Sequence, residues 1–178
     1  MKRIRLQAEA YRLGHCFSVT LTTAERARLF TERKAVQTGL TALKETARKY
    51  KATIYAYCFM PDHLHLLAST PHAVSFIDFI RHFKQLSAYR LRRQFQSSGS
   101  VWQTRFYDHA LRSDEGLGTA ASYIFDNPVR AGIVENAADY PYSGSLAWQG
   151  ALSASGSEDP DLHLHRLHRQ AMTNVKKL

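Results

Sequence analysis

The 178-residue sequence has no hydrophobic run that approaches the roughly 18 apolar residues a membrane-spanning helix needs. Its longest apolar stretches, residues 54–60 and 64–68, have the length of β-strands. It has only two cysteines, Cys16 and Cys58, which match no disulfide or zinc spacing and are expected to be buried thiols. Polar residues interrupt the basic start of the chain before a signal-peptide core can form. We therefore expect a cytoplasmic protein with no membrane association.

Acidic side chains are scarce relative to basic ones: 15 Asp and Glu stand against 24 Lys and Arg, a net charge of +9. This excess favours a polyanionic partner, because each neutralised phosphate releases counterions. Charge alone does not separate a nucleic-acid-binding protein from a merely basic soluble one. The composition, with 44% hydrophobic residues, is typical of a globular domain. Because a Ser-, Gly- and acid-rich stretch begins at Gly150, we predict one domain at 1–149 and a polar, basic tail at 150–178.

Hydrophobic periodicity and turn residues predict alternating strands and helices, without an internal repeat. Residues 53–68 are predicted to form a β-hairpin. On its first strand we expect Tyr55, Tyr57 and Phe59 on one face, opposite Ile54, Ala56 and Cys58. The predicted order is that of a ferredoxin-like split βαβ sandwich, an α/β (α+β) fold whose antiparallel sheet has helices on one face and a free second face. The predicted strands are 15–22, 53–59, 63–68 and one within 102–111, and the predicted helices are about 24–50, 74–95 and 114–126.

The most distinctive local feature is a pair of histidines, His63 and His65, two residues apart on a predicted strand. Residues i and i+2 of a strand share a face, so the two imidazoles lie side by side and suit a divalent metal. This spacing alone is a weak indication, because paired strand histidines are more often structural. A histidine-triad nucleotide hydrolase would need a third histidine where Leu67 stands, which excludes that class.

A second feature is the spacing of Tyr123 and Asn127, which places both side chains on one face of the last predicted helix. An amide oxygen is a plausible third metal ligand, and a phenol beside a metal could act as a nucleophile. The alternative is a surface tyrosine followed by an asparagine that ends the helix. Pro128 predicts a helix end or a kink at this point.

Three blocks of the sequence resemble a known family. Residues 56–67 are similar to the HUH signature of single-tyrosine transposases, in which two histidines flank one hydrophobic residue. Residues 101–109 and 123–134 resemble the two downstream blocks of the REP-associated tyrosine transposases, bacterial relatives of insertion-sequence transposases that are associated with repetitive extragenic palindromes. The similarity runs from about Gly14 to Trp148, with the blocks in the family's order.

The resemblance implies an HUH-endonuclease fold in which His63 and His65 bind Mg²⁺ or Mn²⁺, Asn127 adds a ligand and Tyr123 is the nucleophile. It further implies nicking and rejoining of single-stranded DNA at palindromic hairpins through a 5′-phosphotyrosine, by a nucleoid-associated monomer or homodimer. Where family members often have an Arg-Gly turn after their first strand, this sequence has residues 22–25, Thr-Thr-Ala-Glu. DNA contacts made by that turn are therefore not expected to carry over unchanged.

Other residues are candidates for DNA contacts, although each also fits a solvated helix face or the core. Two other functions stay open: a nucleic-acid-binding module that does not cut, and a relaxase or replication initiator. His15 and His109 fit either the site or the core, and the histidines of the tail, His163, His165 and His168, fit a nonspecific basic arm better than a metal cluster. The candidate phosphate contacts are Arg81, Lys84, Arg92, Arg105 and Arg130, and the candidate stacking residues are Tyr55, Tyr57, Trp102 and Tyr107.

Overall fold

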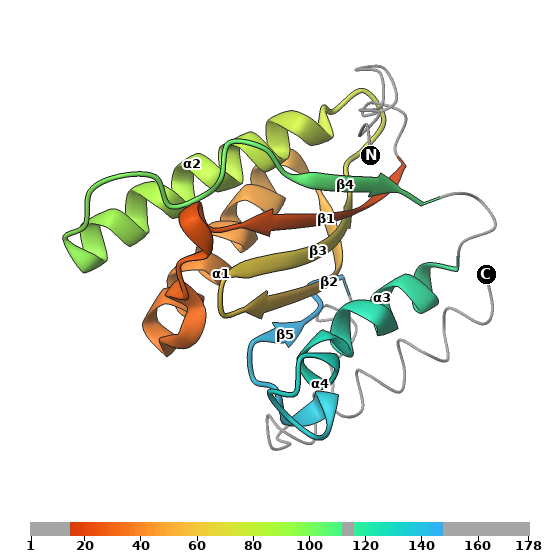
Figure 1. The fold of residues 1–178 in the computed structure, drawn as a ribbon. Helices are drawn as coiled ribbons and strands as arrows, with labels where there is room; N and C mark the ends of the chain where they lie inside the picture. The colour runs from red at the N-terminus through yellow and green to blue at the C-terminus, as the bar shows by residue number, and fades with distance from the viewer. Residues whose placement is uncertain (1–14, 112–115, 148–178) are drawn as a thin grey trace, which may run out of the picture.

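A computed structural model describes residues 15–111 and 116–147, and its centre is a five-stranded antiparallel sheet (Figure 1). The strand order β4-β1-β3-β2-β5 contains the ferredoxin-like order of the first four strands, with β5 added at the β2 edge. The predicted α/β class and antiparallel sheet are therefore confirmed. The strands are β1 (Cys16–Thr22), β2 (Thr53–Met60), β3 (His63–Ser69), β4 (Tyr107–Ala110) and β5 (Ser143–Gly144).

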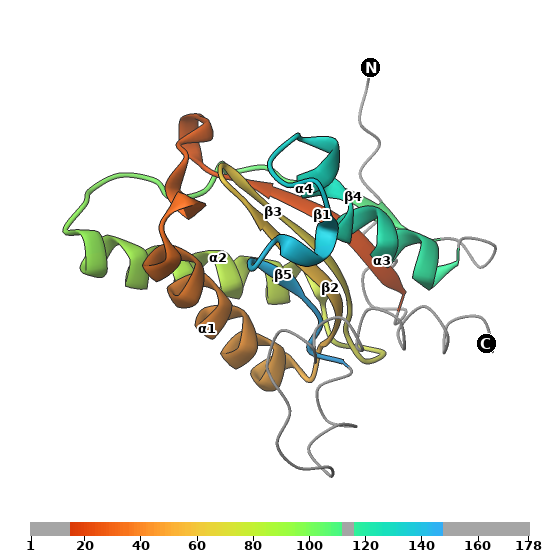
Figure 2. The ribbon, with the colours of Figure 1, turned by 90° about the horizontal axis from the view of Figure 1, so that it is seen from below.

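Two long helices, α1 (Arg33–Tyr50) and α2 (Phe76–Phe95), cover one face of the sheet (Figure 2). Phe17 of β1 stacks on Phe76 with ring centroids 4.5 Å apart. A Cβ at Gly39 would lie 2.8 Å from the Phe59 ring, so glycine allows α1 to approach β2 closely. Burial of aromatic side chains between these layers is the main stabilising contribution on this face.

The segment before α1 differs from the predicted helix over 24–50. It forms two short 3₁₀ turns, η2 (Ala24–Arg26) and η3 (Leu29–Thr31), and α1 begins only at Arg33. Glu25 and Arg26 both have φ of 53°, a left-handed conformation that a continuous helix cannot contain. Helix-favouring composition was misleading here, because the side chain and amide of the buried Thr23 anchor the turn to the β2–β3 connection.

The second face of the sheet is not fully free, which corrects part of the prediction. The helices α3 (Leu117–Phe125) and α4 (Asn127–Arg130) lie on this side, and Ile124 and Phe125 pack on β2 and β3 (Figure 2). Tyr140, which follows the turn η4 (Ala137–Asp139), donates a hydrogen bond of 2.6 Å to the carbonyl of Phe59. A second, smaller apolar cluster therefore covers the β2 side of this face.

A β-bulge in β2 changes the predicted faces of two residues. Ile54 pairs with Ala68, while Ala56 pairs with Leu67, so Tyr55 is the extra residue between them. Ile54 consequently packs toward α1 and α2, and Tyr55 packs against the opposite cluster. From Ala56 onward the predicted alternation is correct.

The sequence also led to expectations about membrane spans, the two cysteines and the C-terminal tail. No helix within the described ranges is long and apolar enough to span a membrane. Cys16 and Cys58 are free thiols, half-buried and buried respectively, and burial raises the pKa of each to about 12. The tail at 150–178, its three histidines and the first two residues of the helix predicted over 114–126 lie outside the described residues.

Candidate active site

The two histidines lie at the beginning of β3 on the face opposite α1 and α2. Antiparallel pairing with β1 places Thr22 opposite His63 and Thr20 opposite His65. The Nε2 atoms of the histidines are 3.0 Å apart, and the ring planes are nearly perpendicular, at 89°. The structure thus confirms that the pair shares one face of the strand, as the spacing predicted.

The other nitrogen of each imidazole has a hydrogen-bond partner. His63 Nδ1 donates to Asp62 Oδ1 at 2.5 Å, and His65 Nδ1 hydrogen bonds with Thr20 Oγ1 at 3.0 Å. Partners of this kind orient metal-binding histidines and select the tautomer whose Nε2 lone pair is available. Both rings are therefore held in place with their Nε2 atoms beside one another.

This arrangement fits a divalent cation. If two nitrogens each lie about 2.1 Å from one ion and the angle between the two metal–nitrogen bonds is about 90°, the nitrogens are about 3.0 Å apart. Among residues 15–111 and 116–147 there is no group of three or more His, Cys, Asp or Glu side chains that could hold a metal. Within the described part of the chain, a further donor to this pair would therefore be of another type, such as an amide oxygen, and a phosphate oxygen or water could add to it.

His65 is kept in its neutral form. Burial, followed by the charges of His63 and Arg130, lowers the pKa of His65 to about 4, against the opposing effect of Asp62. A neutral imidazole is the form that binds a metal, since protonation would occupy the lone pair.

Tyr123 lies on the exposed side of α3, with 53% of its surface accessible. The next two residues along α3, Ile124 and Phe125, are buried. The guanidinium of Arg130 lies over the Tyr123 ring, 4.1 Å from the ring centroid. The charge of Arg130 also lowers the pKa of His65, so this arginine contacts the Tyr123 ring and acts electrostatically on His65.

Asn127 occupies the junction between α3 and α4. Its Nδ2 donates to the carbonyls of Tyr123 and Ile124 at 2.9 and 3.3 Å, and Pro128 follows in the first turn of α4. The helix break expected at Pro128 and the helix-ending contact of Asn127 are both present. Both bonds use the amide nitrogen of Asn127 and fix the orientation of its side chain. A metal would be bound through the amide oxygen.

The predicted phosphate contacts have different surroundings. Arg81 forms an ion pair with Asp78, whereas Lys84 donates to the carbonyls of Gln103 and Thr104, and burial lowers the Lys84 pKa. Lys84 therefore tethers the segment that leads to β4. Arg92 donates to the carbonyl of Gly99 at 3.3 Å and Arg105 is exposed, while Arg130 lies at Tyr123.

The predicted stacking residues divide into buried and exposed ones. Tyr57 and Trp102 are buried, and Trp102 Nε1 donates to Ser87, so stacking on DNA is excluded for both. Tyr55 is half-buried. Tyr107 is 51% exposed and pairs with Thr20, which in turn pairs with His65. Tyr107 therefore lies beside the histidine pair, on the same face. On β4 the exposed His109 shares that face, and His15 is exposed immediately before β1.

Three residues near the histidines were not singled out from the sequence: Thr20, Arg26 and Asp62. Arg26 Nη1 is 3.1 Å from Asp62 Oδ2, so this carboxylate contacts both Arg26 and His63. Burial acts to raise the pKa of Asp62, but the hydrogen bonds from His63 and Arg26 hold it below its usual value. Thr20 was detectable only from the strand register, whereas Asp62 directly precedes His63. Arg26 supplies an arginine in the turn where the family's Arg-Gly pattern is missing.

The chain is similar to several known proteins. The family model described as "Transposase IS200 like" matches residues 14–127. A Haemophilus influenzae protein named "Putative REP-associated tyrosine transposase" is 34% identical over 112 residues, which cover 57% of this chain and 64% of that protein. The REP-associated tyrosine transposase of Escherichia coli K12 is 26% identical over 130 residues, 71% of this chain and 73% of that protein.

A solved structure of a REP-associated tyrosine transposase bound to a REP hairpin has a TM-score of 0.67 and 23% identity, covering 89% of this chain and 93% of that one. At this identity the likeness concerns the fold. The chain spans slightly less than two thirds of the Haemophilus relative. The matched range 14–127 covers most of this chain and contains His63, His65, Tyr123 and Asn127. The chain therefore belongs to the family of IS200-like transposases.

Proposed function

We propose that this protein is a metal-dependent enzyme that nicks and rejoins single-stranded DNA beside palindromic hairpins of the REP type. The observation that carries the proposal is the histidine pair, whose two Nε2 atoms lie 3.0 Å apart on one strand face, while Arg130 contacts the Tyr123 ring and its charge lowers the pKa of His65. The hairpin in the related solved structure supports a hairpin partner. The enzyme would act on the chromosome, in the cytoplasm, as a monomer or a homodimer.

The metal would be held by His63, His65 and the amide oxygen of Asn127. The family is generally metal-dependent, and the mixed nitrogen and oxygen donors suit Mn²⁺ at least as well as Mg²⁺, which prefers oxygen ligands. A bound cation would withdraw charge from a non-bridging phosphate oxygen and orient the scissile bond. Asp62 and Thr20 contribute by holding the imidazoles in the required orientation.

Tyr123 would carry the chemical step. Its phenolic oxygen forms a bond to phosphorus as the bond from phosphorus to the 3′ oxygen breaks; the phenol loses its proton, and the departing oxygen gains one. The products are a 5′-phosphotyrosine and a free 3′-hydroxyl. Because the phosphotyrosine ester conserves the energy of the broken bond, another 3′-hydroxyl can attack it and rejoin DNA. Arg130, beside the phenol, is placed to stabilise charge on the phosphate.

The exposed residues around the histidines favour an unpaired substrate. Tyr107 presents an exposed aromatic ring next to Thr20 and His65, where a base separated from its partner could stack. In-line attack at phosphorus also needs a backbone that can bend into the site, and a single strand bends more easily than a duplex. The substrate would therefore be the unpaired DNA at the foot of a hairpin.

The test is formation of a covalent DNA–protein adduct. Incubation with a labelled hairpin oligonucleotide that carries unpaired flanks, plus Mn²⁺ or Mg²⁺, should give a DNA-linked protein band in a denaturing gel. Tyr123→Phe should abolish the band and retain DNA binding, because only the phenolic oxygen is removed. Tyr50→Phe, a matched change on α1, should leave the band unchanged.

Each other outcome has a definite meaning. An adduct that persists in Tyr123→Phe would show that another residue is the nucleophile. Tight hairpin binding by the unaltered protein without an adduct would favour a module that binds but does not cut. Relaxation of a supercoiled origin plasmid, with no action on palindromic hairpins, would favour a relaxase or replication initiator.

A further inference from the structure

At the C-terminal end of α2 the structure has a pocket of about 530 Å³ that the predicted catalytic residues do not use. It is lined by Tyr89, Arg92, Arg93 and the loop 96–99. We propose that this pocket binds unpaired nucleotides next to the hairpin, with a base stacked on Tyr89 and the adjoining phosphates contacted by Arg92 and Arg93. The inference rests on the proposed function, because it identifies where the single strand of that substrate binds.

Tyr89 has the properties of a stacking platform. It is 52% exposed, and the other exposed tyrosines among the described residues, Tyr107 and Tyr123, belong to the candidate active site. Arg93 Nη1 donates to Tyr89 Oη at 3.1 Å, and its guanidinium carbon lies 5.7 Å from the ring centroid. The ring is therefore held in place by a cationic neighbour, which is the combination that binds single-stranded nucleic acid without reading its sequence.

The charges at this pocket are not neutralised by neighbouring carboxylates. Within 15–111 and 116–147, Arg81 and Arg90 of α2 form ion pairs with Asp78 and Glu45, whereas Arg92 and Arg93 form none. Arg92 makes one hydrogen bond, to the Gly99 carbonyl, and a guanidinium has five N–H donors. Both arginines consequently retain charge and donors for phosphate oxygens.

The pocket lies at the same end of the sheet as the histidine pair. Gly99, in its wall, is three residues before Trp102, and Trp102 forms a bridge with Thr23. Thr23 in turn donates to the carbonyl of Asp62, the residue that holds His63. Figure 1 shows the last turns of α2 and the loop after it extending past the end of the sheet where β1 finishes. A few nucleotides could therefore connect the two places.

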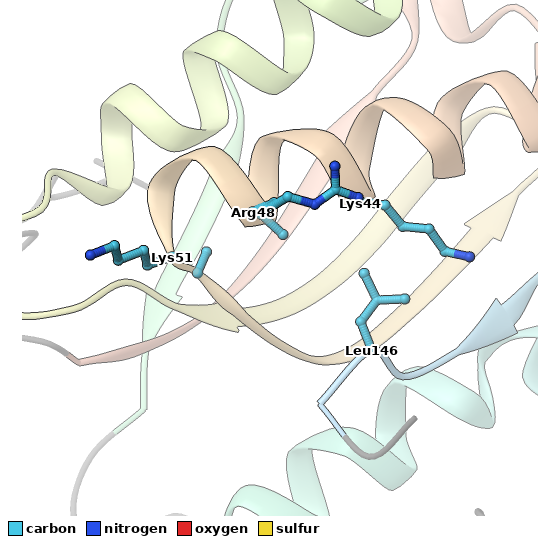
Figure 3. A pocket seen from close by; sticks show the side chains of 6 residues that line it. Lys44, Arg48, Lys51 and Leu146 are labelled. Atoms are coloured by element: carbon cyan, nitrogen blue, oxygen red, sulfur yellow. The ribbon is translucent and has the colours of Figure 1, made fainter. Parts of the chain in front are cut away.

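A second basic pocket provides a contrast. Lys44, Arg48, Lys51 and Leu146 line a pocket of about 430 Å³ at the C-terminal end of α1 (Figure 3). Its lining includes three cationic side chains and no aromatic ring. It lies near the beginning of β2, and the histidines follow the far end of that strand, eight residues or about 26 Å away. A substitution that removes one positive charge at this pocket is therefore a matched control for the nonspecific effect of charge on DNA binding.

The experiment compares two DNAs by fluorescence anisotropy: a hairpin with an unpaired tail and the same hairpin with a blunt end. The protein is the full chain carrying Tyr123→Phe, so that cleavage does not alter the DNA. Tyr89→Ala should weaken binding of the tailed hairpin about 5- to 150-fold and leave the blunt hairpin unchanged. Tyr89→Phe should bind the tailed hairpin nearly as well as the parent, because the stacking surface is retained.

The arginines are tested by salt dependence. Arg93→Gln should reduce the slope of log affinity against log salt by about 0.7 for the tailed hairpin, as expected when one single-strand phosphate contact is lost. Arg48→Gln, at the pocket without an aromatic ring, should not change the difference in affinity between the hairpin with an unpaired DNA tail and the blunt hairpin. Thermal melting of every variant checks that folding is intact.

Two results would overturn the inference: Tyr89→Ala leaving the tailed hairpin unaffected, or Tyr89→Ala weakening both hairpins equally, which would place Tyr89 on the duplex stem. The proposed function fails separately. If the unaltered protein forms a covalent adduct but Tyr89→Ala binds the tail normally, only the pocket assignment is wrong. If tail binding depends on Tyr89 and no adduct forms, only the cutting activity is wrong.

Discussion

The two faces of the central sheet are built from the same strands, yet they differ in what their side chains do. Toward α1 and α2 the strands present Phe17, Leu21, Phe59 and other large apolar residues that are almost completely buried. On the opposite face, β1 and β3 present Thr20, Thr22 and the two histidines. Hydrogen bonds, rather than close apolar packing, position the side chains there.

The difference follows from how the second face is covered. The helix α3 packs mainly on β2 and β3, through a small cluster around Ile124 and Phe125. The part near β1 and β4 consequently keeps polar and exposed residues such as Tyr107. A sheet with one face filled by two long helices can carry a polar site on the other face, because the first face supplies most of the buried apolar area.

The largest expected effects test this division directly. Phe59→Ala should lower the free energy of unfolding by about 3–5 kcal/mol, because it removes a fully buried ring that packs against Phe30 and Tyr57. His65→Ala should abolish formation of the DNA adduct at a much smaller cost in stability. Urea denaturation and the adduct assay, applied to both variants, measure the two effects.

A large loss of stability on the polar face would contradict this difference between the two faces. If His65→Ala unfolded the protein as much as Phe59→Ala, the polar face would also be a major source of stability. Leu66→Ala serves as the matched control, since Leu66 is the neighbour of His65 on the same strand but points into the α1 and α2 core. Like Phe59→Ala, Leu66→Ala should lower the free energy of unfolding, by about 2–5 kcal/mol.

A middle-sized effect is expected at Asp62, which orients His63. Asp62→Ala should weaken Mn²⁺ binding about 10- to 100-fold, because the imidazole loses the acceptor that fixes its tautomer. Asp62→Asn keeps an acceptor oxygen and should lose less. Titration calorimetry with Mn²⁺ on the full chain measures both, and Asp78→Asn, which breaks only the surface pair with Arg81, should bind as the parent does. Unchanged Mn²⁺ affinity in Asp62→Ala would remove Asp62 from the site.

Sequence periodicity was most informative where apolar side chains determine the structure. The predicted strands at 15–22, 53–59 and 63–68 and the helix at 74–95 each lie within two residues of the observed elements. Residues 24–31 were predicted wrongly, because their composition favours helix while the hydrogen bonds of Thr23 to a distant turn favour tight turns. The bulge at Tyr55 was also missed, since nothing in an alternating pattern marks an inserted residue.

The candidate site was only partly accessible from the sequence. His63 and His65 could be paired because strand geometry relates residues two apart. Thr20 could not be assigned without the register between β1 and β3, which depends on the packing of the whole sheet. The effect of the Arg130 charge on His65 depends in the same way on how α3 packs on the sheet. Relations within one element are predictable from spacing, whereas relations between elements require the fold.

The smallest expected effect concerns the polar pair on the outside of the helical layer, where Arg90 of α2 meets Glu45 of α1 through two hydrogen bonds of 2.8 and 2.7 Å. The hydrogen bond from Arg90 lowers the pKa of Glu45 below its usual value. A carboxylate with a depressed folded-state pKa contributes stability above its unfolded pKa, and that contribution disappears as the pH falls through the folded value. Arg90→Gln should therefore cost about 0.2–1 kcal/mol at pH 7, since solvent screens this partly exposed pair, and progressively less as the pH falls through the folded-state pKa of Glu45. Urea denaturation at pH 7 and at lower pH measures this, with Lys34→Gln as the control for loss of one positive charge on α1, since Lys34 does not act on the pKa of Glu45. A cost that stayed the same at pH 3 would mean that Arg90 acts through packing of its aliphatic stem rather than through Glu45.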